Sequence, residues 1–232
     1  MPSILITGAN RGLGLEFAEQ YLTGGWRVFA TCRDPASASQ LNCLADASKG
    51  AVDIIALDVT DAPSVKAAAK RLSGAAIDVL LNGAGVMGAP ERQRFGNIDY
   101  SAWVEVLDIN ALGPTRVSEA FVDHVAASDR KLIVTITSGM GSLADNTSGG
   151  WIAYRTSKAA VNMVMKTLSI DLAPRGISSV VVNPGWVRTD MGGPNATLSP
   201  AESVTALKRL IETLGPDQTG KFFNYDGKEY SW

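Results

Sequence analysis

The chain has 232 residues and a mass of 24.4 kDa, which suits a single domain, residues 1–232, with a large apolar core. Hydrophobic residues make up 46% of the chain and charged residues 19%, a composition that excludes a disordered protein. The net charge is −2 and no run of like charges stands out, which excludes a basic surface for nucleic acid or anionic lipid.

Short β-branched runs alternate with longer helical patterns along the whole chain. In chain order, we expect a strand at 3–7, a helix from about Gly12, strands at 26–32 and 53–59, a helix at 64–72, a strand at 78–85, a long helix at 101–125, a strand at 131–138, a helix at 154–172, a strand at 177–183, a helix at 200–214 and a last strand at 221–225. Several strands are apolar throughout, which is typical of a parallel sheet covered on both faces. The pattern predicts a doubly wound, Rossmann-type α/β sheet with helices on both faces.

No segment of the sequence predicts export or membrane insertion. The N-terminal stretch MPSILITGANRG lacks both a basic flank and a long apolar run. No later window approaches ~18 uninterrupted apolar residues. We therefore expect a cytoplasmic protein with no membrane partner.

The chain has few side chains for metal binding or for a hydrolase. Cys32 and Cys43 are the only cysteines, too few for a disulfide framework or a thiolate metal site. A serine hydrolase or a zinc site would need the single histidine, His124, to serve every role. His124 falls in FVDHVAAS, which we interpret as the exposed end of a helix. We assign it no role and expect no metal.

A glycine-rich turn follows the first predicted strand. In TGANRGLG, Gly8, Gly12 and Gly14 follow Thr7 and open a helix. Glycines allow a tight turn and close backbone approach, and free N–H groups at a helix start attract a pyrophosphate. The spacing GxxxGxG differs from GxGxxG and is a weak signal alone, since a purely conformational turn has the same composition. Its place after the first strand of an alternating chain favours nucleotide binding.

The run YRTSK places Tyr154 and Lys158 one turn apart on one face of a predicted helix. Such a pair is more often a partly buried ring beside a solvated lysine. At this spacing, however, an ammonium favours the ionised form of a phenol and lowers its pKa from an ordinary value of about 10. Tyr154 would then be a usable acid or base.

Six motifs in order resemble the short-chain dehydrogenase/reductase family over nearly the whole chain. They are TGANRGLG, LDVTD with Asp58, LLNGAGV, LDINALGP with Asn110, TSGMG with Ser138 followed by YRTSK, and NPGWVRT at 183–189. Within the family, the turn ANRGLG, the insertion DNTSGG and the ending FFNYDGKEYSW resemble the C-factor and sniffer type of carbonyl reductase. The resemblance implies an NADP(H)-dependent enzyme that acts on a small carbonyl or alcohol substrate.

The resemblance also implies the site residues. The expected catalytic residues are Asn110, Ser138, Tyr154 and Lys158. The expected cofactor-binding residues are Gly8, Asn10, Arg11, Gly12, Leu13, Gly14, Arg33, Asp58, Val59, Asn82, Gly83, Ala84, Gly85, Tyr154, Lys158, Pro184, Gly185, Val187 and Thr189.

Each catalytic residue has an implied role in carbonyl reduction. Tyr154 would protonate the carbonyl oxygen while the nicotinamide delivers hydride, and Ser138 would hold that oxygen by a hydrogen bond. Lys158 would tune the tyrosine and bind the nicotinamide ribose. Asn110 resembles the residue that holds a water in a proton relay behind the lysine. Ser142 is a nearby alternative to Ser138, because the gap before Tyr154 is longer than usual in the family, but Ser138 ends a strand.

The choice of cofactor follows from the end of the second strand. Asp34 lies ~20 residues after the glycines and could suggest a ribose-binding acid and NAD. The position that ends the strand is instead Cys32, followed by Arg33. Arg11 adds a second guanidinium suited to a 2′-phosphate. We therefore expect NADPH.

The remaining expectations concern substrate and assembly. The stretches 145–150 and 192–200 follow strands and should border the binding edge, where four apolar residues would suit a hydrophobic aldehyde or ketone: Met140, Trp151, Trp186 and Met191. The helices at 101–125 and 154–172 carry more apolar surface than one sheet face needs, and the family commonly pairs them between subunits. We expect a homodimer or homotetramer. A mainly NADP(H)-binding signalling protein of C-factor type remains the alternative function.

Overall fold

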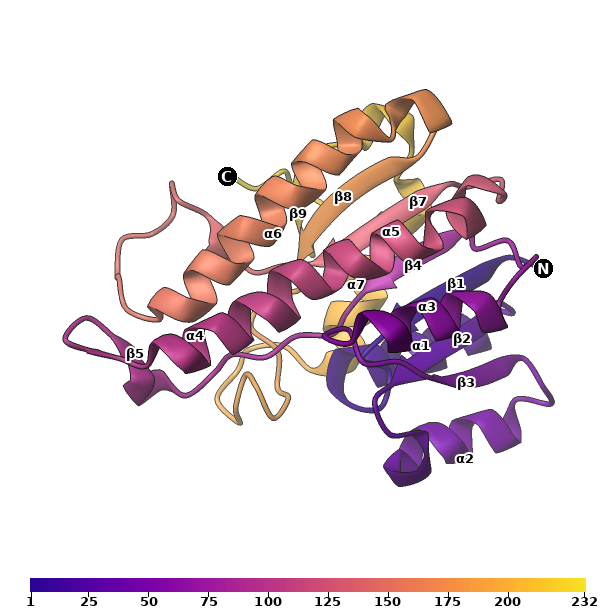
Figure 1. The fold of residues 1–232 in the computed structure, drawn as a ribbon, viewed down its shortest axis with the longest axis horizontal. Coiled ribbons are helices and arrows are strands. Elements are labelled where there is room, and N and C mark those ends of the chain that lie inside the picture. Colours follow the sequence, from indigo (N-terminus) through magenta and orange to yellow (C-terminus); the bar gives the residue numbers. More distant parts are fainter.

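A parallel sheet of seven strands forms the centre of the molecule, in a computed structural model that describes residues 1–232 (Figure 1). Its strands are β1 (Ser3–Thr7), β2 (Arg27–Cys32), β3 (Val52–Ala56), β4 (Val79–Asn82), β7 (Leu132–Ile136), β8 (Ser178–Asn183) and β9 (Phe222–Asn224). Their order is β3-β2-β1-β4-β7-β8-β9. The chain leaves β1 in one direction and continues beyond β4 in the other, so the crevice between these two strands is the expected ligand position.

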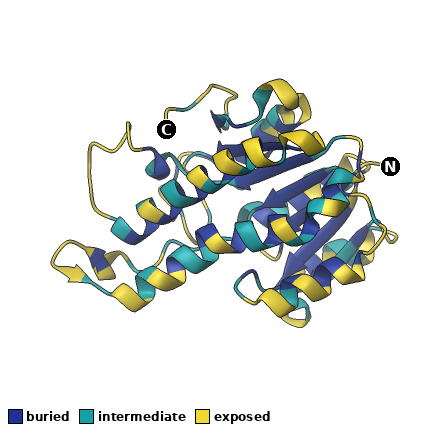
Figure 2. Cartoon of the chain, turned by 45° about the horizontal axis from the view of Figure 1, so that its top comes forward, coloured by how far each residue is buried: buried dark blue, intermediate teal, exposed yellow.

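Helices cover both faces of this sheet. On one face lie α1 (Gly12–Thr23), α2 (Ser39–Ala47) and α7 (Pro200–Thr213), and on the other lie α3 (Ala62–Arg71), α5 (Gly113–Ala126) and α6 (Ile152–Asp171), with α4 (Tyr100–Leu107) packed on α6. Two apolar clusters of 24 and 21 buried residues fill the two layers. Figure 2 shows the buried strands between helices whose outer faces are exposed. The doubly wound Rossmann-type sheet is confirmed.

Short elements complete the fold. A two-stranded antiparallel hairpin consists of β5 (Gln93–Arg94) and β6 (Asn97–Ile98). Single turns of 3₁₀ helix occupy Pro35–Ser37, Pro90–Arg92, Gly139–Gly141, Ala173–Arg175 and Pro216–Gln218, and a π-helical turn occupies Asp108–Leu112. No helix in the chain combines the length and the apolar content that crossing a membrane requires.

Polar residues begin the surface helices in the positions that the sequence favours. The Asp61 carboxylate accepts a hydrogen bond from Ser64 N at the start of α3. Ser199 and Glu202 form a reciprocal capping box at the start of α7. These caps satisfy N–H groups that a helix cannot pair internally, so they fix where the two helices begin.

The structure differs from the expected elements at three places. The helix expected at 101–125 is interrupted by the π turn Asp108–Leu112 and so becomes α4 and α5. Helix α2 was not expected, because only one of its residues, Leu41, is fully buried and its apolar pattern is weak. The hairpin of β5 and β6 was also not expected, since two-residue strands carry almost no periodic signal.

The expectation that His124 lies at an exposed helix end is wrong. It does lie in the last turn of α5, but its ring is half-buried and packs at 5.2 Å from the Phe121 ring. Its Nε2 lies 3.1 Å from the Ala69 carbonyl oxygen. These contacts are structural, and His124 stays outside the site described next.

Candidate active site

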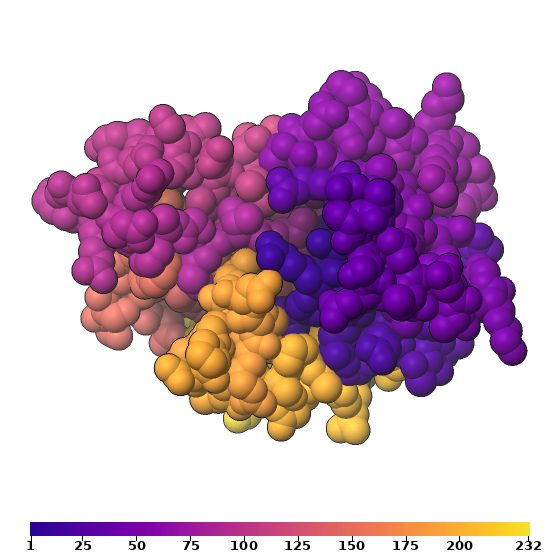
Figure 3. Space-filling model, turned by 90° about the horizontal axis from the view of Figure 1, so that it is seen from below, coloured from indigo at the N-terminus to yellow at the C-terminus, as the bar shows by residue number.

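The carboxyl ends of four neighbouring strands bring the expected site residues to one edge of the sheet. The glycine turn follows β1, residues 82–85 follow β4, Ser138 follows β7, and residues 184–189 follow β8. Because parallel strands end at the same edge, these segments meet although they are up to 180 residues apart. In Figure 3 the orange segment after β8 meets the indigo N-terminal segment beside a recess in the surface.

Tyr154 lies in the first turn of α6, and its side chain is buried. Burial raises the pKa of Tyr154 above its ordinary value, and a hydrogen bond with Ser138 opposes this rise. The Ser138 hydroxyl itself accepts a hydrogen bond from Met140 N at 3.1 Å, which orients it. The structure therefore brings Ser138 and Tyr154 together, as expected from the sequence, with the phenol in its protonated form.

Lys158 lies one turn after Tyr154 and is also buried. Its Nζ lies 5.7 Å from the Tyr154 ring centroid and donates a hydrogen bond to the Ile136 carbonyl oxygen at 3.0 Å. Burial lowers the pKa of Lys158 to about 8. No carboxylate pairs with this ammonium, so the lysine is held at a cost in free energy.

The pKa of Tyr154 differs from one expectation. We expected the Lys158 ammonium to lower it, but burial raises the pKa of Tyr154, and the one group that opposes this rise is Ser138. The physical reason is that both Tyr154 and Lys158 are removed from water, so each charged form is disfavoured. In the chain alone, the phenol of Tyr154 is therefore held in its protonated form.

Asn110 joins this group from the π turn. Its buried amide accepts a hydrogen bond from Val86 N at 2.8 Å and donates to the Val86 carbonyl oxygen at 2.7 Å and to Ser157 Oγ at 3.0 Å. A Cβ added to Gly85 would lie 3.2 Å from Asn110 Oδ1 and 3.6 Å from Lys158 Nζ. Asn110, Gly85 and Lys158 therefore border the same space.

Two buried amides hold the backbone around the expected catalytic residues, and the sequence did not indicate either of them. Asn162 accepts a hydrogen bond from Thr137 Oγ1 at 2.6 Å and donates to the Gly141 carbonyl oxygen at 3.4 Å, so it brackets Ser138 on both sides. Polar residues on a surface helix usually face solvent, but the side chains of Asn162 and Ser169 are both buried.

Gln93 is the second missed amide, and it is 2% exposed. Its Oε1 accepts a hydrogen bond from Tyr154 N at 3.0 Å, and its Nε2 donates to the Met87 and Ala89 carbonyl oxygens at 3.0 and 3.2 Å. Helix α6 has no cap from its own N-terminal neighbour Trp151, whose φ is +53°. Gln93 thus supplies the cap from 61 residues away, a partnership that no local pattern indicates.

The turn after β1 has the tight backbone that a nucleotide-binding turn needs. A Cβ on Gly14 would lie 2.1 Å from the Gly8 carbonyl oxygen, and Gly8 has a φ of +71°. A Cβ on Gly83 would lie 2.9 Å from the Thr7 carbonyl oxygen, so a side chain here would force a neighbour to shift. No side chain caps the first turn of α1, so its N–H groups remain available for a pyrophosphate.

The groups expected to recognise the adenosine end lie at the same edge. Arg33 follows β2 and is exposed. Burial alone would raise the pKa of Asp58, but hydrogen bonds from Thr60 N at 2.9 Å and Thr60 Oγ1 at 2.7 Å, with the Arg33 charge, hold it below its usual value. Arg11 is exposed and forms an ion pair with Asp190 at 3.0 Å. Asp190 was not expected to contact the glycine turn.

The apolar residues expected around the substrate lie on the loops of this edge. Trp186 and Met191 are exposed, and Trp151 and Met140 are half-buried. Leu143, which the sequence reading did not select, is also exposed. Figure 1 shows the β5–β6 hairpin and the loop before α6 projecting on the same side of the molecule.

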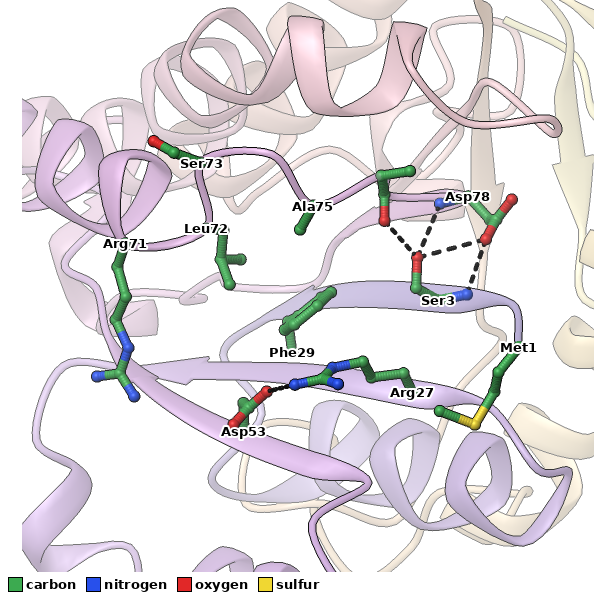
Figure 4. A pocket seen from close by; sticks show the side chains of 11 residues that line it. Met1, Ser3, Arg27, Phe29, Asp53, Arg71, Leu72, Ser73, Ala75 and Asp78 are labelled. Atoms are coloured by element: carbon green, nitrogen blue, oxygen red, sulfur yellow. Dashed lines mark hydrogen bonds and ion pairs between the residues drawn. The ribbon is translucent and has the colours of Figure 1, made fainter.

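A hollow lies at the opposite edge of the sheet, where β1, β2 and β3 begin (Figure 4). It has a volume of about 530 Å³ and includes Arg27, Phe29 and Asp53 in its wall. Three of the four charged side chains in its wall have partners, because Arg27 pairs with Asp53 at 2.6 Å and Ser3 N donates to Asp78 at 2.8 Å; the fourth is Arg71. None of the expected site residues lines it.

This chain is similar to several known proteins. A family model described as short chain dehydrogenase matches residues 2–198. The C-signal protein of Myxococcus xanthus is 46% identical over 156 residues, which span 67% of this chain and 93% of that protein. The structure of the carbonyl reductase Sniffer of D. melanogaster matches with a TM-score of 0.93 and 34% identity over all of both chains. The NADPH-bound carbonyl reductase from chicken fatty liver also matches with a TM-score of 0.93 and 34% identity, over 100% of this chain and 99% of that one.

Proposed function

The chain belongs to the short-chain dehydrogenase family, and we propose that it reduces an aldehyde or ketone to an alcohol with NADPH as its cofactor. The observation that carries this proposal is the buried group of Ser138, Tyr154 and Lys158 at the carboxyl edge of the sheet. A lysine buried without a carboxylate partner is costly in a core, and beside a protonated phenol it is useful in proton transfer.

The chain's own residues account for the proton transfer. When bound, NADPH would supply the hydride that adds to the carbonyl carbon. Tyr154 would give its hydroxyl proton to the carbonyl oxygen, because its raised pKa keeps that proton available. Ser138 would donate a hydrogen bond to the same oxygen. The Lys158 ammonium would stabilise the phenolate left on Tyr154, and Asn110 would hold the water through which the proton is replaced.

The residues present fit a phosphorylated dinucleotide. Gly8 and Gly14 in the turn have no space for a Cβ, and the uncapped start of α1 would receive the pyrophosphate. Cys32 stands where an NAD-binding protein has an acid, and the guanidinium of Arg33, the next residue, suits a 2′-phosphate. The NADPH-bound neighbour supports this choice of cofactor.

For the substrate we propose only a chemical class, and for the location only a compartment. Trp186, Met191 and Leu143 are exposed on loops of the catalytic edge, and they would favour an apolar carbonyl compound. We expect the reaction to take place in the cytoplasm.

We also propose that the chain forms a homodimer or homotetramer. Helices α4 and α6, with the turn after α4, leave several apolar side chains exposed, which would be costly in a monomer: Tyr100, Val104, Leu112, Met163 and Ile170. Light scattering at micromolar concentration should give at least twice 24.4 kDa. Met163→Glu should reduce that mass to one chain, and a wild-type mass near 24.4 kDa would contradict the proposal.

A signalling protein that binds NADP(H) with little turnover is the second candidate, favoured by the 46% identity to the C-signal protein. The experiment that separates the two is a panel of carbonyl compounds followed by NADPH absorbance, with NADH in parallel. Turnover that is lost in Tyr154→Phe supports the reductase. Tight NADPH binding without turnover of any compound would favour the signalling protein.

A further inference from the structure

The segment that follows β9 folds back against the strand it leaves. Asn224 N donates to the Lys228 carbonyl oxygen at 2.8 Å, and Tyr230 N donates to the Phe222 carbonyl oxygen at 2.7 Å. The Tyr230 and Trp232 rings pack on Phe222 with centroid distances of 4.9 and 5.5 Å. We call residues 225–232 the return segment.

The return segment reaches the loop that directly follows Ser138. The Tyr230 hydroxyl donates to Asp145 Oδ2 at 2.5 Å. The Trp232 carbonyl oxygen accepts from Ala144 N at 3.0 Å and from Ser142 Oγ at 3.2 Å. Figure 1 shows the end of the chain beside this loop. Residues 139–146 are therefore held by three contacts from a segment that lies about 90 residues further along the chain.

The Tyr230 hydroxyl also lies close to the backbone of Gly139, the residue that follows Ser138. A Cβ added to Gly139 would lie 2.8 Å from the Tyr230 hydroxyl oxygen. Any movement of the tyrosine toward the loop would therefore displace Gly139, and Ser138 with it. The hydrogen bond to Asp145 and partial burial raise the pKa of Tyr230 to about 12, so its hydroxyl remains a donor over the working pH range.

We propose that Tyr230 is a positioning residue for the reduction, because the return segment fixes the 139–146 loop and so holds the Ser138 hydroxyl toward Tyr154. This role rests on the proposed function. It also gives a purpose to the long spacing between Ser138 and Tyr154, whose added residues include Asp145, the acceptor for the Tyr230 hydroxyl. The glycine turn that follows β1 makes no hydrogen bond with the return segment and should not respond.

The kinetic test is Tyr230→Phe, which keeps the ring on Phe222 and removes only the hydroxyl. We expect kcat/KM for the carbonyl compound to fall about three- to tenfold, mainly through kcat, with unchanged NADPH affinity. Asp145→Asn should have a similar effect, and the double variant should be little worse than either single variant. Tyr225→Phe is the matched control, since its hydroxyl makes no hydrogen bond in the structure, and it should behave as wild type.

A second test does not depend on turnover. Hydrogen exchange followed by mass spectrometry should show faster exchange across residues 140–146 in Tyr230→Phe, including the Ala144 amide that donates to Trp232, with no change around residues 8–14. A wild type that reduces no carbonyl compound would defeat the proposed function, while this exchange still tests the contact. Wild-type kcat/KM in Tyr230→Phe, unchanged exchange, or an equal loss of NADPH affinity would each overturn the positioning role.

Discussion

The two edges of the sheet differ in whether their charged side chains are paired and exposed or unpaired and buried. At the edge where the strands begin, Arg27 and Asp53 pair in an open hollow and remain partly exposed. At the edge where the strands end, Lys158 is buried beside Tyr154 with a carbonyl oxygen as its hydrogen-bond acceptor. The hollow of Figure 4 thus belongs to the edge where charged side chains are paired and partly exposed.

This difference indicates where chemistry takes place. A surface ion pair costs little to form and contributes little, so it needs no function to explain it. A buried ammonium without a carboxylate lowers stability, and it is expected where its charge is used. The two edges differ in the free-energy cost of burying their charged side chains. Four substitutions or titrations can test that difference.

The largest expected effect is that of Tyr154→Phe. The ring keeps its packing while the transferable proton is removed, so turnover should fall at least ~10³-fold and NADPH affinity should stay within about twofold. Steady-state kinetics and fluorescence titration of NADPH measure the two quantities. Retention of a tenth of the wild-type turnover would remove Tyr154 from the mechanism.

The second effect is a pH dependence at the same edge. Reduction needs Tyr154 protonated and Lys158 charged; burial keeps the first condition at high pH but lowers the pKa of Lys158 to about 8. The rate of carbonyl reduction should therefore fall as pH rises above about 8, approaching tenfold per pH unit. A profile of kcat/KM from pH 6 to 10 tests this. A profile that stays flat to pH 10 would show that the ammonium is not needed.

A smaller effect is expected where the cofactor's phosphate would bind. Arg33→Ala should raise KM for NADPH by about 10- to 150-fold, the range of a lost charge-assisted hydrogen bond of roughly 1.5–3 kcal/mol, and should change KM for NADH little. Arg11→Ala should act in the same direction but less strongly, because Asp190 already engages that guanidinium. Equal changes for both cofactors would mean that neither arginine meets a 2′-phosphate.

The smallest effect should come from the opposite edge. Arg27→Ala removes the pair with Asp53 and a cation–π contact at 5.3 Å over Phe29, both near the surface. The free energy of unfolding should change by about 1 kcal/mol or less, and kcat/KM should not change. Denaturant unfolding and the standard assay test this. A clear loss of activity would break the contrast between the two edges.

The cofactor half of the site could be predicted from the sequence because its rules are local. The turn after β1 has no room for a Cβ at Gly8 or Gly14, so both positions need glycine. This turn directly follows a strand of five apolar or small residues. The order of strands and helices predicted the fold for the same reason. The family resemblance drawn from these motifs is confirmed by the family model.

The support of the catalytic half could not be predicted in the same way, because its partners are distant in the chain. Gln93 caps Tyr154 across 61 residues, and Tyr230 meets Asp145 across 85. For Asn162 the sequence does not show whether the side chain faces solvent or the core. A polar residue on a helix is usually exposed, but this one accepts a hydrogen bond from the buried Thr137 hydroxyl. Only the packed structure reveals which polar residues turn inward.

The π turn between α4 and α5 makes the length of this segment as important as its composition. Removing one residue from Asp108–Leu112 would let the i→i+4 hydrogen bonds of a regular helix run through this turn and would close the wide turn that carries Asn110. The Asn110 amide would then leave Val86. Substitutions here change one contact at a time, whereas a single deletion would remove all three hydrogen bonds of this amide together.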